Sequence, residues 1–260
     1  MSQFANQAIR KIDTAKQLLL QAKRTVVLTG AGISTPSGIP DFRSEGTGLW
    51  SKSEAMEVAS LTTFRYEPSV FFEWFRPLAR QIINANPNAA HTTLATLQKE
   101  NFIDTVITQN IDVLHQKAGS ENVIEMHGTL RTLSCTQCFH QVDSKPFLEP
   151  FVKDGIIPHC TACGAVLKPD VILFGEQLPQ KAWFEARAAA RNCDLMLIIG
   201  SSLEVLPVAG LPMHMLDRGG HLIIINQTPT YLDIRADIVF REDAADILPL
   251  LEKQVLTHAR

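Results

Sequence analysis

TGAGISTPSGIPDFRSEGTG, from Thr29 to Gly48, follows the apolar run TVVL at 25–28 and decides the fold. A buried strand that ends in Gly-x-Gly begins a dinucleotide-binding unit, because glycines let a pyrophosphate approach the backbone. The third glycine of the G-x-G-x-x-G pattern is missing, since Thr35 occupies its position, and two prolines follow where a helix should start. We therefore predict a phosphate-binding turn that continues into an ordered loop instead of a helix.

The composition is that of an ordinary globular protein. The 260 residues are 45% hydrophobic and 20% charged, and the net charge is −3. This charge predicts no direct nucleic-acid binding and no polybasic membrane contact. No apolar run approaches the roughly 18 to 20 residues of a membrane-spanning helix, and the N-terminus lacks the apolar core of a signal peptide. We expect a cytoplasmic protein that does not associate with membranes.

Apolar runs alternate with helical patterns along most of the chain. We expect buried strands at 25–30, 104–109, 194–200, 221–226 and 236–240. Nearly continuous apolar runs are typical of parallel strands that are covered on both faces. The alternation predicts an α/β fold with a doubly wound parallel sheet. Two regions break the alternation, at 46–87 and 129–169, and we interpret them as insertions that fold beside the sheet.

Four of the five cysteines form two C-x-x-C pairs, Cys135 with Cys138 and Cys160 with Cys163. Two such pairs can supply four thiolates to one tetrahedral ion, which predicts a closed, structural Zn²⁺ site. His140 and His159 are alternative ligands, and two redox-active pairs are an alternative interpretation. The fifth, Cys193, precedes an apolar strand and is expected to be a small buried hydrophobic residue.

Small or amide-bearing residues follow four of the expected strands. In open α/β sheets ligands bind outside the carboxyl ends of the strands, so a nucleotide would account for all of these residues together. His127 lies just before the cysteine region and has the pKa class of a general base. The residues at the strand ends are Gly30, Ala31, Gly32, Gln109, Asn110, Asp112, Gly200, Ser201, Ser202 and Asn226.

Seven motifs in order resemble the sirtuins, a family of NAD-dependent protein deacylases. They are GAGIS, SGIPDFR, TQNID, MHG, the two C-x-x-C pairs, KPDVILFGE and GSSLEVLP, and the likeness extends from about 26 to 251. The resemblance implies a Rossmann-like NAD-binding domain at 1–45, 88–128 and 170–260. It also implies a small domain made of a helical module at 46–87 and a zinc-binding module at 129–169.

The resemblance further implies a role for each matching residue, with NAD as a co-substrate. Asn110, Asp112 and His127 would be catalytic, His127 as the general base. Acyl-lysine peptides would bind as an added strand along Val171, Leu173, Phe174, Gly175 and Glu176. NAD would contact Gly30, Ala31, Gly32, Ser34, Ile39, Asp41, Phe42, Arg43, Gln109, Asn110, Ile111, Asp112, Gly200, Ser201, Ser202, Asn226 and Ala244.

The acyl preference is predicted from two positions. The branch of the family that removes acidic acyl groups carries a Tyr and an Arg three residues apart, and the matching positions here hold Phe75 and Leu78. Neither side chain can pair with a carboxylate, so we expect acetyl or longer aliphatic groups, although Arg76 and Arg80 lie nearby. Mono-ADP-ribosyl transfer and NAD hydrolysis, a non-catalytic NAD or ADP-ribose sensor, and a hydride-transferring dehydrogenase are the alternatives.

Overall fold

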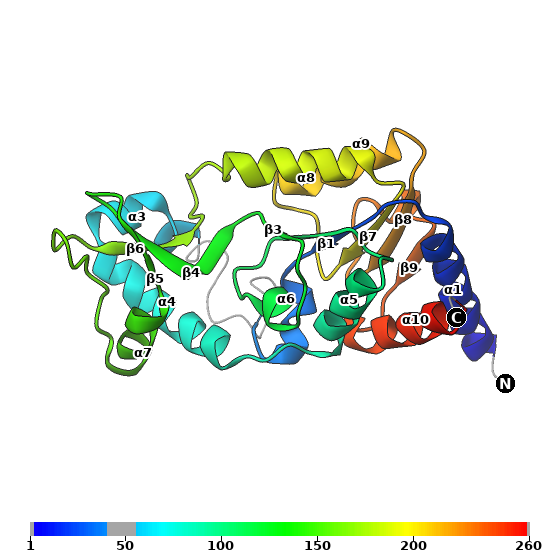
Figure 1. The fold of residues 1–260 in the computed structure, drawn as a ribbon, viewed down its shortest axis with the longest axis horizontal. Helices are drawn as coiled ribbons and strands as arrows, with labels where there is room; N and C mark the ends of the chain where they lie inside the picture. Colours follow the sequence, from blue (N-terminus) through cyan, green and yellow to red (C-terminus); the bar gives the residue numbers. More distant parts are fainter. Residues whose placement is uncertain (1–2, 41–55, 259–260) are drawn as a thin grey trace.

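The computed structural model describes residues 3–40 and 56–258, with side chains from residue 10 onward. Within these residues the largest sheet has six parallel strands in the order β3-β2-β1-β7-β8-β9 (Figure 1). This order confirms the predicted doubly wound sheet. The chain adds strands toward one edge from β1 to β3 and toward the other edge from β7 to β9, so the order reverses between β1 and β7. The strands are β1 (Thr25–Thr29), β2 (Thr105–Thr108), β3 (Val123–Glu125), β7 (Leu195–Ile199), β8 (His221–Ile225) and β9 (Ile238–Phe240).

Helices cover both faces of this sheet (Figure 1). Alternate residues of β1 point to opposite faces, so Val27 packs in one core and Leu28 in the other, and both are fully buried. The first core is covered by α1 (Gln3–Gln21), α5 (Ala89–Lys99) and α10 (Ala244–His258). The second is covered by α8 (Gln180–Asn192) and α9 (Leu211–Leu216).

A second group of elements lies at the other end of the molecule (Figure 1). An antiparallel sheet has the order β5-β4-β6. Three phenylalanines of α4 pack against one another and against Phe151 of α7, some rings stacked and others edge to face, so that aromatic contacts join the two helices. The elements are α3 (Leu61–Tyr66), α4 (Pro68–Asn84), β4 (Gly128–Cys135), β5 (Gln141–Asp143), α7 (Lys145–Asp154) and β6 (Leu167–Val171).

The segment after β1 is not a helix, as the sequence predicted. Two short 3₁₀ turns follow instead, η1 (Ala31–Ile33) and η2 (Thr35–Ser37), and Gly38 ends the second in the left-handed region with φ +84°. Three further short elements are α6 (Leu114–Lys117), η3 (Val208–Gly210) and η4 (Asp233–Arg235). None of the helices in the described part of the chain has the length and apolarity needed to cross a membrane. The predicted domain boundaries stay predictions.

Candidate active site

The turns after β1 and β7 pack directly against each other at the point where the strand order reverses. A Cβ on Gly30 would lie 2.7 Å from the Gly200 carbonyl oxygen, and one on Gly32 would lie 2.8 Å from the Gly200 Cα. Gly200 itself has φ +60°, and a Cβ there would lie 2.3 Å from the Ile33 nitrogen. All three glycines are therefore required by backbone-to-backbone packing, in addition to any role beside a phosphate.

Most amides of the Gly-x-Gly turn are already used by the protein. The Gly32 N–H donates to the Gly200 carbonyl at 2.9 Å, and the N–H groups of Gly30, Ile33 and Ser34 also donate to carbonyls. The Ala31 N–H has no acceptor among the described residues. An anion at this turn would therefore meet the Ala31 amide first.

Ser34, Asn110 and Asp112 form a buried hydrogen-bonded cluster beside this turn. The Ser34 hydroxyl donates to Asp112 Oδ2 at 2.7 Å, and Asn110 Nδ2 donates to the Gly30 carbonyl and to Ser34 Oγ, each at 3.1 Å. Asp112 Oδ1 accepts the Leu114 N–H at 2.9 Å. The structure thus brings together three predicted site residues, with Ser34 and Asp112 almost completely buried.

Two buried histidines extend this cluster, and the sequence analysis missed both. His91 Nε2 lies 3.5 Å from Ser34 Oγ, and its Nδ1 accepts the Asn88 N–H, so Nε2 carries the proton. His115 Nε2 lies 3.0 Å from Thr29 Oγ1, and the two rings meet edge to face at 5.0 Å. Burial lowers the pKa of His91 to about 4, although Asp112 opposes the change. Burial and the neighbouring His91 lower the pKa of His115 to about 3.

These two lowered pKa values predict that the protein loses stability in mild acid. Below about pH 6.5 the unfolded chain binds protons at both histidines, whereas the folded protein does not until about pH 4 and 3. Stability is therefore full above pH 6.5 and falls as the pH decreases, by about 2.7 kcal/mol per unit for the pair. Urea unfolding between about pH 7 and pH 5 measures this slope. The slope of stability with pH should fall by about half in His115→Gln but stay unchanged in His221→Gln, since His221 is exposed. Equal slopes in the two variants would contradict the role given to the buried histidines.

His127 lies between the two groups of elements, directly before β4. Its Nδ1 is 2.9 Å from the Gln109 carbonyl oxygen. Because a carbonyl only accepts, Nδ1 carries the proton and Nε2 carries the lone pair that a general base needs. The Ile172 N–H donates to the His127 carbonyl at 2.9 Å, which ties this histidine to the segment after β6. Gln109 Nε2 in turn donates to Ser201 Oγ at 2.8 Å.

The residues at the strand ends fit a dinucleotide. The Ser202 hydroxyl is buried and has no partner among the described residues, which is costly unless a ligand satisfies it. A cavity of about 480 Å³ lies beside Gly200, and its walls include five predicted contacts, Gly32, Ile39, Gly200, Asn226 and Ala244. This volume is within the range of pockets that bind small molecules and cofactors such as a dinucleotide. Ile111 is half-buried against the aromatic core. Asp41, Phe42 and Arg43 lie outside the described residues.

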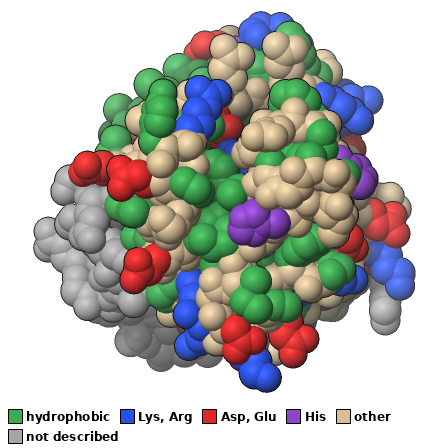
Figure 2. Space-filling model, turned by 90° about the vertical axis from the view of Figure 1, so that its left-hand side faces the viewer, with side chains coloured by type: hydrophobic (Ala, Val, Ile, Leu, Met, Phe, Trp, Pro, Cys, Tyr) green, Lys and Arg blue, Asp and Glu red, His purple; other side chains and the backbone are tan. Residues whose placement is uncertain are grey.

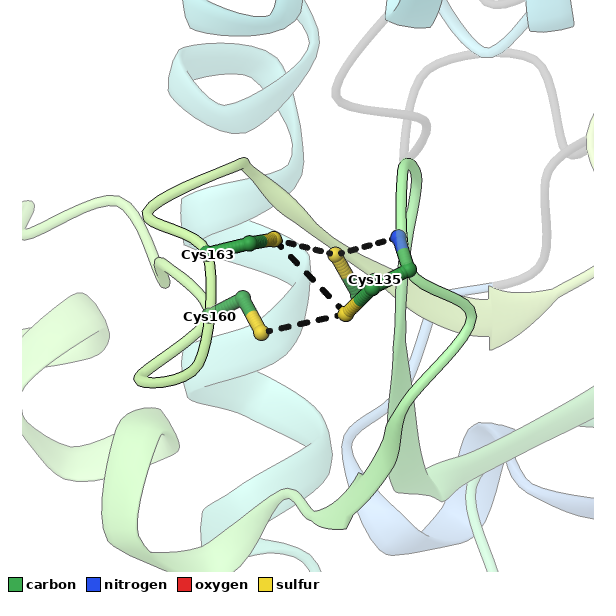
Figure 3. Close-up of side chains that lie close together, drawn as sticks. Cys135, Cys160 and Cys163 are labelled. Atoms are coloured by element: carbon green, nitrogen blue, oxygen red, sulfur yellow. Dashed lines mark hydrogen bonds between the residues drawn. The ribbon is translucent and has the colours of Figure 1, made fainter.

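The four paired cysteines gather into one cluster beside the small sheet, where Cys135 ends β4 (Figure 3). Their ligand atoms all lie within 4.8 Å of one another, with Sγ–Sγ distances of 3.4, 3.6 and 3.7 Å between the closest pairs. Sulfurs bound to one tetrahedral Zn²⁺ are about 3.8 Å apart. The N–H groups of Gln137 and Cys138 each point at Cys135 Sγ at 3.4 Å, as donors to a thiolate do. The donor set therefore fits zinc without His140 or His159.

Zinc is expected to bind in a single equivalent and to support the fold of the small sheet. Cys135→Ser should lose the metal and unfold this region, because ligand thiolates couple binding to folding. Metal content and circular dichroism measure both effects. Cys193→Ala is the matched control, since Cys193 is a buried free thiol, the pKa of which burial raises to about 12. A Cys135→Ser protein with full zinc content would refute the site.

The predicted substrate segment is only partly extended, which corrects the expectation for its second half. β6 ends at Val171, and the Glu176 N–H then donates to the Leu173 carbonyl at 3.0 Å. Gly175 adopts φ +89°, so residues 173–176 form a turn. The Phe174 N–H and carbonyl are paired with Ala59 and Leu61. A peptide that binds here would therefore find few unpaired backbone groups between Leu173 and Glu176.

Comparison with known proteins identifies the family. The sequence model of the Sir2 family matches residues 30–207. The chain belongs to the Sir2 family. The NAD-dependent protein deacylase 2 of Archaeoglobus fulgidus is 43% identical over 246 residues, covering 94% of this chain and 96% of the relative. The NAD-dependent protein deacetylase 2 of Caldanaerobacter subterraneus subsp. tengcongensis is 47% identical over 231 residues, covering 89% and 90%.

Solved Sir2 structures share the whole fold. A structure described as Sir2 with p53 peptide and NAD⁺ has a TM-score of 0.85 and 36% identity, covering 94% of this chain and 98% of that one. A Sir2 variant with deacetylated p53 peptide and 3'-O-acetyl ADP ribose has a TM-score of 0.87, also with 36% identity, and covers 94% and 98%. The sirtuin resemblance predicted from the motifs is confirmed.

Proposed function

We propose that this Sir2 protein is an NAD-dependent protein-lysine deacylase. The observation that carries the proposal is His127, held by Gln109 with its lone pair on Nε2, beside the buried Ser34, Asn110 and Asp112 cluster. One acyl-lysine, one NAD and one water would give free lysine, nicotinamide and O-acyl-ADP-ribose.

The proposed NAD contacts follow the surfaces described above. The pyrophosphate would lie at the turns of β1 and β7, against the Ala31 amide and the Ser202 hydroxyl. The adenosine end would occupy the cavity near Asn226 and Ala244. The nicotinamide end would lie toward the Ser34 cluster and Ile39. Asp41, Phe42 and Arg43 are proposed NAD contacts on the family resemblance alone.

The residues of the cluster have distinct chemical tasks in this proposal. Loss of nicotinamide develops positive charge on the ribose, which the Asp112 carboxylate and the Asn110 amide oxygen would stabilise. Asn110 is oriented for this task because its NH₂ group is fixed by Gly30 and Ser34. His127 Nε2 would then accept a proton from a ribose hydroxyl as the acyl group is transferred.

The end of the molecule that carries the substrate segment exposes apolar side chains near the middle of its face (Figure 2). Val171 and Leu173 are buried in the aromatic core, whereas Phe174 is 48% exposed. An acyl-lysine peptide would pair with the backbone near β6 and cover part of this surface, which supplies affinity with little sequence selectivity. The cytoplasm is the proposed location.

The contacts of two arginines support a preference for uncharged acyl groups. Arg76 donates to the carbonyls of Val152 and Lys153, and Arg80 donates to that of Val152. Both guanidinium groups therefore bind the C-terminal end of α7, where the helix dipole favours cations. Phe75 and Leu78 are each 2% exposed and lie in the aromatic core. None of the four side chains is placed to bind an acidic acyl group.

A panel of matched acetyl, myristoyl and succinyl peptides tests this preference and the reaction together. Acetyl or myristoyl peptides should react at least about tenfold faster than succinyl peptide, since an unpaired carboxylate in an apolar site costs more than 1.4 kcal/mol. Mass spectrometry should find O-acyl-ADP-ribose. A dominant succinyl rate would overturn the acyl preference, and ADP-ribosylated protein as the main product would favour the transferase alternative.

A further inference from the structure

The turn that follows β6 is closed by its own glutamate. Glu176 Oε2 accepts the Leu173 N–H at 2.8 Å, while the Glu176 N–H donates to the Leu173 carbonyl at 3.0 Å. The side chain and the backbone of Glu176 thus satisfy both backbone polar groups of Leu173. The carboxylate of Glu176 points back into its own segment and is only 20% exposed.

Lys168 completes this arrangement from within β6. Its Nζ lies 2.9 Å from Glu176 Oε2 and donates to the carbonyls of Val171 at 2.7 Å and Pro169 at 3.2 Å. An ammonium group has three donors, so these three acceptors satisfy it fully. With a side chain that is only 16% exposed, Lys168 connects the end of the strand to the end of the turn.

The segment between these two residues is where the substrate is proposed to bind. Beyond Val171, its other hydrogen bonds to the rest of the protein are neutral backbone bonds, from Ile172 to His127 and from Phe174 to residues 59–61. Within the described residues, Lys168–Glu176 is the ion pair that spans the segment. Half-buried, hydrogen-bonded pairs of this kind contribute more than surface pairs, because they are less screened by water.

We propose that the Lys168–Glu176 pair positions the peptide-binding segment, and that Glu176 is a positioning residue and not a substrate contact. This inference rests on the proposed deacylase function. Breaking the pair should loosen the turn at 173–176 and shift its exposed backbone, while the strand ends that would hold NAD stay in place. Peptide affinity should therefore fall with little change toward NAD.

Lys168→Met and Glu176→Gln test the pair in the full-length protein. Met keeps most of the aliphatic stem, and Gln keeps the acceptor for the Leu173 N–H, so each variant chiefly removes one charge. Fluorescence anisotropy with a labelled acetyl-lysine peptide should show about tenfold weaker binding for each, the effect of losing a hydrogen bond to a charged group. The peptide KM should rise similarly, with the NAD KM and kcat unchanged.

The double variant and a surface pair serve as controls. Lys168→Met/Glu176→Gln should bind no more weakly than the weaker single variant, because both remove one interaction. Lys181→Met removes an exposed pair with Glu185 on α8 and should leave peptide binding unchanged. Unchanged peptide affinity in both single variants, or equal rises in the KM of peptide and NAD, would overturn the inference. A wild-type protein that neither binds nor deacylates the peptide would instead refute the proposed function.

Discussion

His127→Ala is expected to lower the deacylation rate by about 10²- to 10⁴-fold, the usual contribution of a general base. The Gln109 carbonyl fixes the proton on Nδ1, so Nε2 is the nitrogen that would accept the ribose proton. Alanine keeps no group that accepts this proton. Binding of NAD should change little, since the proposed pyrophosphate contacts lie on other residues. Initial rates with an acetyl peptide measure the first effect and calorimetry with NAD measures the second.

His258→Ala is the matched control for this substitution. His258 also directs Nδ1 at a backbone carbonyl, that of Gln254, but it is exposed near the end of α10. Its removal should leave the rate unchanged. Full deacylase activity in His127→Ala would eliminate His127 as the base.

Gly128→Ala is expected to destabilise the protein by about 3 kcal/mol or more. Gly128 has φ +77°, and a Cβ there would lie 2.0 Å from the Asp170 carbonyl oxygen, where β4 pairs with β6. A side chain in the left-handed region costs about 1 to 2 kcal/mol, and the overlap with backbone adds to this because neither strand can move freely. The displacement would also move His127, the preceding residue in the chain. Urea unfolding and the deacylation rate measure the two effects.

Gly219→Ala separates the conformational cost from the overlap. Gly219 has φ +80°, but a Cβ there would meet no atom within 4 Å. The free energy of unfolding of this variant should decrease only by the cost of the left-handed conformation, about 1 to 2 kcal/mol, and its activity should be normal. Equal destabilisation by the two substitutions would show that β4 and β6 are not tightly packed at Gly128.

The parallel strands could be predicted because each is a nearly continuous apolar run that is buried on both faces, as Leu195–Ile199 illustrates. β3 was missed because only Ile124 of its three residues is buried, so it has no apolar run. The helix α10 and the pairing of β4 with β5 and β6 were missed for two different reasons. Pro249 lies inside α10, although the buried Ile247, Leu248, Leu251 and Val255 follow helical spacing. The strand partners of β4 come from other parts of the chain, so local periodicity does not reveal the pairing.

The candidate site was predictable where chemistry depends on residue type, as for the four cysteines and for Asn110 and Asp112. His91 and His115 carried no such signal, because a histidine on a helix is distinguished only by what it packs against. The turn at Gly30 and Gly32 was predicted from the approach of a phosphate to the backbone. Its packing against Gly200 could not be predicted, because Gly200 follows a strand far along the chain. The turn at 173–176 was not predicted, because the hydrogen bonds between Leu173 and Glu176 that close it leave no pattern in the sequence.

The central claim is that NAD is consumed together with an acyl-lysine substrate. The direct measurement is nicotinamide release from NAD by the purified protein, with and without an acetyl-lysine peptide. We expect rapid release only when the peptide is present, in equal amount to the deacetylated peptide formed. Release at the same rate without peptide, or deacetylation without nicotinamide release, would contradict the account.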